Sequence, residues 1–166
     1  ERDRETAQIW GSRGAVLGMM QRHEEAFESF DQAVTLEPDD GTTWLNRGLA
    51  LEILERFKDA EQSFQKATEL NPRSFKSWSH LGYVLTKGDR FEQAQESFER
   101  ALALKPDYPH ALYSQAVCHL AQRDIDRSLE KLEQAIEVNP RYRETARSDP
   151  DFYELWEDGW FRDLVR

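Results

Sequence analysis

His80 and His110 are the residues whose type and spacing most resemble a chemical site in this chain. They fall at similar places in two neighbouring segments of the same layout, so folding should bring them near one wall of the molecule. Two imidazoles can hold a metal ion or an anion jointly, but zinc sites usually have three or four ligands. We therefore expect no metal ion and no cofactor.

The other groups that could take part in a reaction are isolated. Cys118 is the single cysteine, which excludes an intrachain disulfide, and we interpret it as a small buried hydrophobic residue. We expect His119 to pack beside it or to face solvent, and His23 to lie in a turn. The chain has no glycine-rich phosphate loop and no HExxH motif. Its many carboxylates indicate a solvated surface, so we predict that it is not an enzyme.

The composition excludes further classes of function. The chain has 166 residues, of which 39% are hydrophobic and 33% are charged, and its formal net charge is −10. An acidic surface repels phosphate backbones, so we expect no nucleic-acid partner and favour a basic or apolar one. No apolar run reaches the roughly 18 residues that cross a bilayer. We expect a cytoplasmic protein, and we interpret the start at Glu1, without methionine, as a trimmed N-terminus.

A repeat of 34 residues organises most of the sequence. Its clearest marks are four equally spaced prolines, Pro38, Pro72, Pro106 and Pro140. Other positions keep the same register: Trp10, Trp44, Trp78 and Leu112; Gly14, Gly48, Gly82 and Ala116; Ala26, Ala60, Ala94 and Ser128; Phe30, Phe64, Phe98 and Leu132; Ala33, Ala67, Ala101 and Ala135. A period of this length predicts one supersecondary unit stacked several times.

Each cycle contains two helical stretches. They are separated where QRHE, ERFK, GDRF and RDID interrupt the apolar period, and the proline closes the second stretch because it cannot continue a helix. Gly and Ala let two helices approach closely, while Trp and Phe fill the wider gaps beside them. We therefore expect Trp10, Trp44 and Trp78 to belong to the core.

The order of Trp, Gly, Ala, Phe, Ala and Pro resembles the tetratricopeptide repeat (TPR) family over residues 7–142. The resemblance implies an all-α fold, a right-handed superhelix of four helix-turn-helix repeats with a C-terminal capping helical segment. The expected segments are an N-terminal tail at 1–6, repeats at 7–40, 41–74, 75–108 and 109–142, and a cap at 143–166. The last repeat is degenerate, and terminal repeats are often atypical because one face has no successor.

The first helices of the repeats carry a second apolar stripe that the pairing of helices does not require. In the second repeat it consists of Leu45, Leu49 and Ile53. In the family these positions line the concave surface, where peptides or helices of other proteins bind; alternatively, they only touch neighbouring helices. We predict that the partner-binding residues are Leu45, Asn46, Leu49, Ile53, Lys76, His80, Tyr83, Tyr113 and Val117.

One branch of the family holds acidic chaperone tails in a clamp of Lys, Asn and Arg side chains. The positions of its first pair are Gly11 and Ala15 here, which cannot bind a carboxylate. Asn46 and Lys76 match the second and third elements, and His80 stands in place of an arginine. The resemblance to this branch is therefore partial.

The segment after the repeats is rich in aromatic residues. Pro150 indicates a helix start at Ser148 or Asp149, and we expect residues 149–164 to cover the last helix pair. The residues that should do so are Phe152, Trp156, Trp160 and Phe161. Alternatively, this segment is a ligand for its own groove or for that of a second copy.

The sequence therefore predicts a non-catalytic interaction module or scaffold that binds a peptide or helix of a partner protein in a concave groove. One alternative is a self-associating assembly module, a homo-oligomer in which the aromatic tail occupies a groove. Another is an accessory domain of an enzyme complex, although the sequence supplies no chemistry for it.

Overall fold

Helices account for most of residues 2–166, which are the residues that the computed structural model describes. Eight of these helices form four consecutive pairs. The pairs are α1 (Arg2–Met19) with α2 (His23–Leu36), α3 (Gly41–Ile53) with α4 (Phe57–Leu70), α5 (Phe75–Lys87) with α6 (Phe91–Leu104), and α7 (Pro109–Ala121) with α8 (Ile125–Val138). None of the helices in this range is both long and apolar enough to cross a membrane.

The two helices of each pair are joined by a short turn with one residue in the left-handed region. These residues are Gln21, Glu55, Asp89 and Arg123, with φ between 57° and 64°. They recur every 34 residues and lie at the four interruptions of the apolar period. The same backbone turn is therefore built four times.

Within a pair, close approach of the helices requires glycine on the first helix. A Cβ atom at Gly48 would lie 2.5 Å from Cε1 of Phe64, and one at Gly82 would lie 2.5 Å from Cε1 of Phe98. Both phenylalanine rings are completely buried. The repeated Gly and Phe positions therefore form one contact in which the ring occupies the space that a side chain would need.

The tryptophans of the repeat are half-buried rather than fully buried. The indole N–H of Trp44 donates a hydrogen bond of 2.7 Å to the carbonyl oxygen of Pro38, and Trp78 donates one of 2.8 Å to Pro72. Each ring thus stabilises the turn that precedes its helix. The prediction that Trp10, Trp44 and Trp78 belong to the core is correct only in part, because each is half-buried, and in Trp44 and Trp78 the indole N–H reaches the preceding surface turn.

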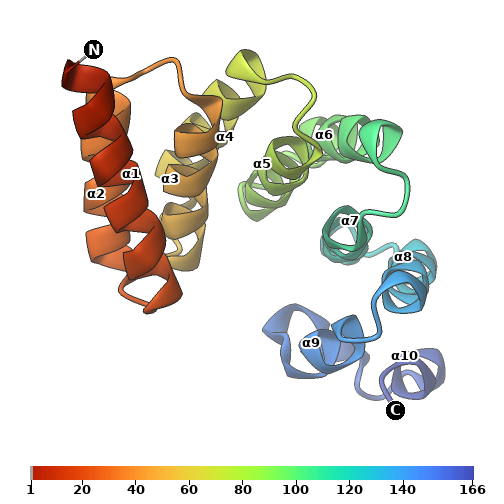
Figure 1. Cartoon of the computed structure of the whole chain (residues 1–166). Helices are drawn as coiled ribbons and strands as arrows, with labels where there is room; N and C mark the ends of the chain where they lie inside the picture. Colours follow the sequence, from red (N-terminus) through yellow and green to blue (C-terminus); the bar gives the residue numbers. More distant parts are fainter. Residues whose placement is uncertain (1) are drawn as a thin grey trace.

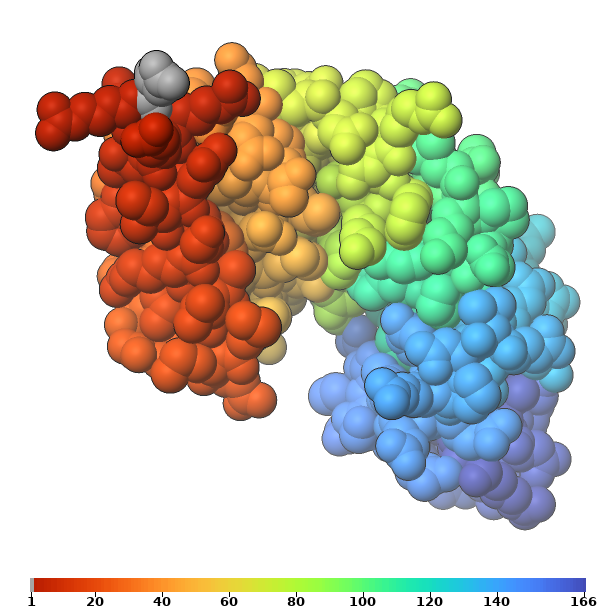
Figure 2. Space-filling model, viewed as in Figure 1, coloured from red at the N-terminus to blue at the C-terminus, as the bar shows by residue number. Residues whose placement is uncertain are grey.

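The four pairs follow one another along an arc (Figure 1), and α3, α5 and α7 lie on its inner side. The space-filling view shows the hollow between the N-terminal pairs and the C-terminal end of the chain (Figure 2). The predicted fold class, an all-α superhelix of four helix pairs with a C-terminal cap, is confirmed.

The C-terminal tail, residues 142–166, folds into α9 (Tyr142–Ser148), a 3-10 helix η1 (Pro150–Leu155) and α10 (Gly159–Leu164). Asp149 and Asp158 cap η1 and α10 by accepting backbone hydrogen bonds. Phe152 and Phe161 are completely buried against the core of α7 and α8. The other apolar residues that the tail buries in this core are Ala146, Leu155 and Val165.

Two of the four aromatic residues expected to cover the last pair do so only in part. Trp156 is 38% exposed and Trp160 is 39% exposed, whereas Leu155 is buried in place of a tryptophan. The reason is the 3-10 geometry of η1, in which residues three apart share a face. Phe152 therefore pairs with Leu155 rather than with Trp156.

Candidate protein-binding surface

The inner side of α1 and α3 forms an open, mostly apolar hollow of about 290 Å³. Among the predicted partner-binding residues, Asn46, Leu49 and Ile53 line it. Ile53 is 57% exposed, while Leu49 is half-buried. On the α1 side the wall consists of the small residues Gly14, Ala15 and Gly18, which leave room for a side chain from outside.

The predicted residues of the second and third repeats have different surroundings. Leu45 is half-buried against the core between the second and third pairs. Lys76 is exposed on α5. Tyr83 is half-buried, with its ring 6.3 Å from that of Phe57, and Lys87 Nζ lies 5.3 Å from the centre of the Tyr83 ring.

The predicted residues of the fourth repeat are covered. Tyr113 and Val117 are only 6% and 4% exposed. The Tyr113 hydroxyl donates a hydrogen bond of 2.5 Å to Oδ2 of Asp149, and its ring lies 5.7 Å from that of Phe152. The tail therefore lies over the part of the inner surface where a partner was expected to bind.

A second contact holds the tail to the inner surface. Lys87 Nζ donates a hydrogen bond of 2.6 Å to Oδ2 of Asp151. The pKa of Tyr113 is raised well above its usual range. The main cause is burial, followed by the hydrogen bond from the Tyr113 hydroxyl to Asp149 and by the negative charges of Asp149 and Asp151. The inner surface is thus open at α1 and α3 and closed at α7.

His80 belongs to a cluster with Glu52 and His110, and its side chain is only 14% exposed. His80 Nδ1 lies 3.0 Å from Oε2 of Glu52, and the centres of the two imidazole rings are 4.0 Å apart. His110 Nδ1 shares a hydrogen bond of 2.7 Å with the Ser79 hydroxyl. The expectation that the two histidines lie near one wall is correct.

Burial determines the protonation of this cluster. Burial raises the pKa of Glu52 to about 7. Burial also lowers the pKa of His80 to about 4, and the positive charge of Lys76 lowers it as well. Burial and the proximity of His80 lower the pKa of His110 to about 3. Both imidazoles are therefore neutral at physiological pH.

Sequence reasoning did not select Glu52. In the 34-residue register it corresponds to Gly18, Thr86 and Leu120. The sequence feature that distinguishes Glu52 is a carboxylate at a position that is uncharged in the other three repeats. Cys118, by contrast, is buried as predicted, and burial raises the pKa of its thiol.

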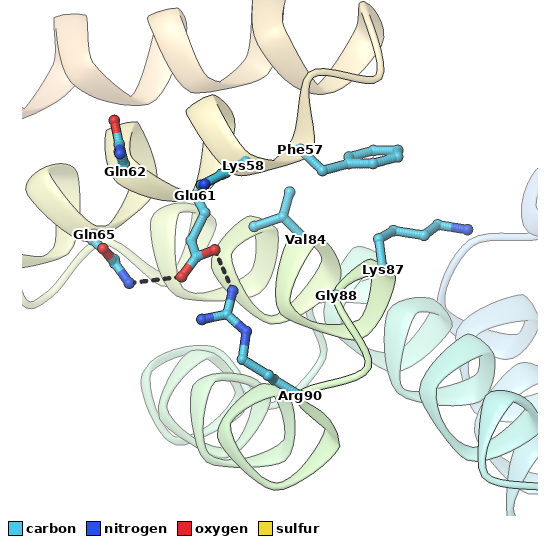
Figure 3. Close-up of a pocket in the computed structure, with 9 residues that line it drawn as sticks. All are labelled: Phe57, Lys58, Glu61, Gln62, Gln65, Val84, Lys87, Gly88 and Arg90. Atoms are coloured by element: carbon cyan, nitrogen blue, oxygen red, sulfur yellow. Dashed lines mark hydrogen bonds and ion pairs between the residues drawn. The ribbon is translucent and has the colours of Figure 1, made fainter.

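The cavity of about 560 Å³ between α4 and the end of α5 offers no comparable surface. Figure 3 shows that the Glu61 carboxylate is directed toward Arg90 and Gln65, which both donate hydrogen bonds to it, while Lys87 points away. Glu61 and Arg90 in its wall are therefore paired with each other, and Lys87 is paired with Asp151.

Profiles of the family described as tetratricopeptide repeat match the chain over residues 7–40, 42–74, 63–96 and 80–150. Together they cover all four helix pairs. No curated protein sequence matches the chain.

Solved structures with a similar fold come from several proteins. MamA, residues 41 to the end, from Desulfovibrio magneticus RS-1 has 21% identity and a TM-score of 0.73, over 96% of this chain and 93% of that one. PilF of Pseudomonas aeruginosa has 16% identity and a TM-score of 0.75, over 99% and 77%. The first TPR domain of Spaghetti (RPAP3), bound to the HSP90 peptide SRMEEVD, has 21% identity and a TM-score of 0.63, over 78% and 94%. At these identities the similarity supports the fold alone.

Proposed function

Because the chain belongs to the tetratricopeptide repeat family, we propose that it is a non-catalytic module that binds a segment of another protein on its inner surface. The observation that carries the proposal is the open apolar hollow between α1 and α3, which includes the exposed side chain of Ile53. Apolar anchors that enter such hollows supply most of the binding energy of protein interfaces.

The chemistry of the hollow defines the kind of partner. Its volume of about 290 Å³ suits a few apolar side chains from one face of a helix or from an extended peptide. Asn46 at its wall supplies polar groups that can orient the partner backbone. The net charge of −10 favours basic residues on either side of the apolar anchors.

The remaining predicted residues extend this surface. In this proposal Lys76 and Tyr83 extend the binding surface along α5, and Leu45, which packs against the core between the second and third pairs, contributes the part of its side chain that stays exposed. Tyr113 and Val117 belong to it only in a state in which the tail has moved away. The partial match to the chaperone-tail clamp carries no weight here, because His80 is paired with Glu52.

The test uses peptides selected from a random displayed library against the intact chain. Selected peptides should carry apolar residues next to basic ones. Substitution of Ile53→Asp should weaken their binding by about 2 kcal/mol or more, measured by fluorescence anisotropy. The matched control is Ile9→Asp, which also replaces an exposed isoleucine, 69% exposed, but on α1 outside the wall of the hollow.

Equal affinity of the two variants for the selected peptides would refute the placement of the binding site. Circular dichroism spectra of both variants establish that they are folded. A selection that yields only acidic peptides would refute the proposed chemistry of the partner.

Self-association is a second candidate function, favoured by the aromatic surface of the tail. Tyr153, Trp156 and Trp160 are 56%, 38% and 39% exposed, and an apolar surface of this kind suits the hollow of a second copy. Sedimentation equilibrium should then show a dimer that the double substitution Trp156→Ala and Trp160→Ala converts to a monomer. A wild-type chain that is monomeric at high concentration would exclude this function.

A further inference from the structure

Three consecutive first helices bring one carboxylate and two imidazoles to one point of the inner wall. Glu52 lies near the end of α3, His80 in the middle of α5, and His110 at the start of α7. One potential ligand atom from each residue lies within 4.8 Å of the other two. We propose that Glu52, His80 and His110 form a binding site for a divalent transition-metal ion of the Zn²⁺ type.

The donor set defines the ion. Imidazole nitrogen suits Zn²⁺, Co²⁺, Ni²⁺ and Cu²⁺, whereas Ca²⁺ and Mg²⁺ prefer oxygen ligands alone. Two histidines and one glutamate are also a set that zinc enzymes use when a fourth position stays open. That position accepts water, or an acidic or histidine side chain of a bound protein.

The charge balance of the cluster also favours a cation. Across residues 2–166, the Glu52 carboxylate is paired with His80 and with no lysine or arginine. Burying a carboxylate without a permanent cation beside it is costly. A divalent ion supplies that charge and turns an unfavourable group into a ligand.

A second feature of the site is the fixed orientation of His110. Its Nδ1 atom shares a hydrogen bond with Ser79, whose side chain is completely buried. When Nδ1 donates this bond, Nε2 keeps the lone pair that binds a metal. Ligating histidines in proteins are commonly held in this way by a partner on the other ring nitrogen.

The site needs a small rearrangement to close around an ion. Bonds of about 2.1 Å in a tetrahedral site place ligand atoms about 3.4 Å apart. His80 Nδ1 and Glu52 Oε2 are already 3.0 Å apart, and the widest separation in the cluster, at most 4.8 Å, must shorten by up to about 1.4 Å. The planes of the two imidazole rings differ by 30°. Solvent can reach the cluster, because the side chains of His80 and Glu52 are 14% and 16% exposed.

The experiment is a calorimetric titration of the intact, metal-free chain with Zn²⁺. One ion should bind per chain and raise the melting temperature, while Mg²⁺ and Ca²⁺ should do neither. The variants Glu52→Gln, His80→Gln and His110→Gln should each lower the affinity by more than about tenfold, because even the loss of an outer partner of a ligand costs 10- to 100-fold. The matched controls His23→Gln and His119→Gln should bind as the wild type does.

Two further readouts keep the proposal testable if a histidine variant does not fold. Glu52→Gln keeps the size and shape of the side chain and should fold, so the Zn²⁺ affinity of this variant alone can decide. In the NMR spectrum of the wild type, Zn²⁺ should shift the imidazole signals of His80 and His110 but not those of His23. Absence of Zn²⁺ binding by the folded wild type, or full retention of binding by Glu52→Gln, would overturn the proposal. The result is independent of peptide binding, which Ile53→Asp tests separately.

Discussion

The Tyr113 hydroxyl donates a hydrogen bond of 2.5 Å to Oδ2 of Asp149, and this contact joins the inner surface of α7 to the residue that caps the 3-10 helix η1 of the tail. Asp149 also caps η1 by accepting a hydrogen bond of 2.9 Å from the backbone N–H of Asp151. One carboxylate therefore both starts the tail helix and fixes it to the repeats. Loss of the hydroxyl should affect the position of the whole tail.

We expect Tyr113→Phe to lower the free energy of unfolding by about 1.5–3 kcal/mol, the usual contribution of a hydrogen bond to a charged group. Denaturation with urea measures this change. Tyr153→Phe is the matched control, because the Tyr153 side chain is 56% exposed and its hydroxyl makes only a long bond of 3.5 Å to the Ser148 carbonyl oxygen. Similar effects of the two substitutions would contradict this role for Tyr113.

The same residue makes the fold sensitive to alkaline pH. The pKa of Tyr113 is raised in the folded chain, first by burial and then by its hydrogen bond to Asp149. A group with a raised folded pKa contributes stability that is present below its unfolded pKa, about 10 for tyrosine, and that is lost as the pH rises further.

Above pH 10 the wild type should therefore lose up to about 1.4 kcal/mol more per pH unit than Tyr113→Phe does. Urea denaturation at a series of alkaline pH values gives this difference directly. The comparison with Tyr113→Phe removes the contributions of Tyr83, Tyr108 and Tyr142, whose pKa values are also raised. Parallel stability curves for the two proteins would contradict the prediction.

The sequence predicts the helix pairs well because residues that recur every 34 positions contact each other within a single pair of adjacent helices. Gly48 and Phe64 meet within one pair, and such a contact depends only on the turn between two adjacent helices. The cluster of Glu52, His80 and His110 depends instead on the angle at which three successive pairs stack. The 34-residue spacing does not encode that angle, so the only sign of Glu52 in the sequence is a carboxylate at a position that is uncharged in the other repeats.

The tail illustrates a different limit. Phe152, Trp156 and Trp160 are four residues apart, which predicts one face of an α-helix. The structure uses a 3-10 turn that buries Phe152 and Leu155 instead. Whether the tail forms an α-helix or a 3-10 helix here depends on how its side chains fit the surface of α7 and α8. The sequence of the tail by itself does not specify that surface.

Burial in the tail gives a prediction that separates its aromatic residues. Phe152→Ala should cost about 3–5 kcal/mol, as expected for a phenylalanine removed from a packed core, because its ring is completely buried beside those of Tyr113 and Phe161. Trp160→Ala removes a larger ring that is 39% exposed and should cost less than half as much. Urea denaturation provides both values, and a greater loss for Trp160→Ala would show that the tail packs differently.

The glycines of the repeat provide the last prediction, in which the same substitution has opposite effects at two positions. The Cβ atom of an alanine at position 48 would lie 2.5 Å from Cε1 of Phe64, and the ring cannot move away because it is completely buried. We therefore expect Gly48→Ala to destabilise the chain by about 1–3 kcal/mol, the usual cost of overpacking a core.

Gly18 near the end of α1 is the matched control. No atom lies within 4 Å of the position that its Cβ would occupy, and its φ is negative, so alanine fits without strain. Gly18→Ala should stabilise the chain by up to about 1 kcal/mol, because alanine loses less backbone entropy than glycine in a helix. Thermal unfolding of the two variants measures both effects, and a rise in melting temperature for Gly48→Ala would show that the first and second helices of a pair are less closely packed than the Gly48 and Phe64 contact indicates.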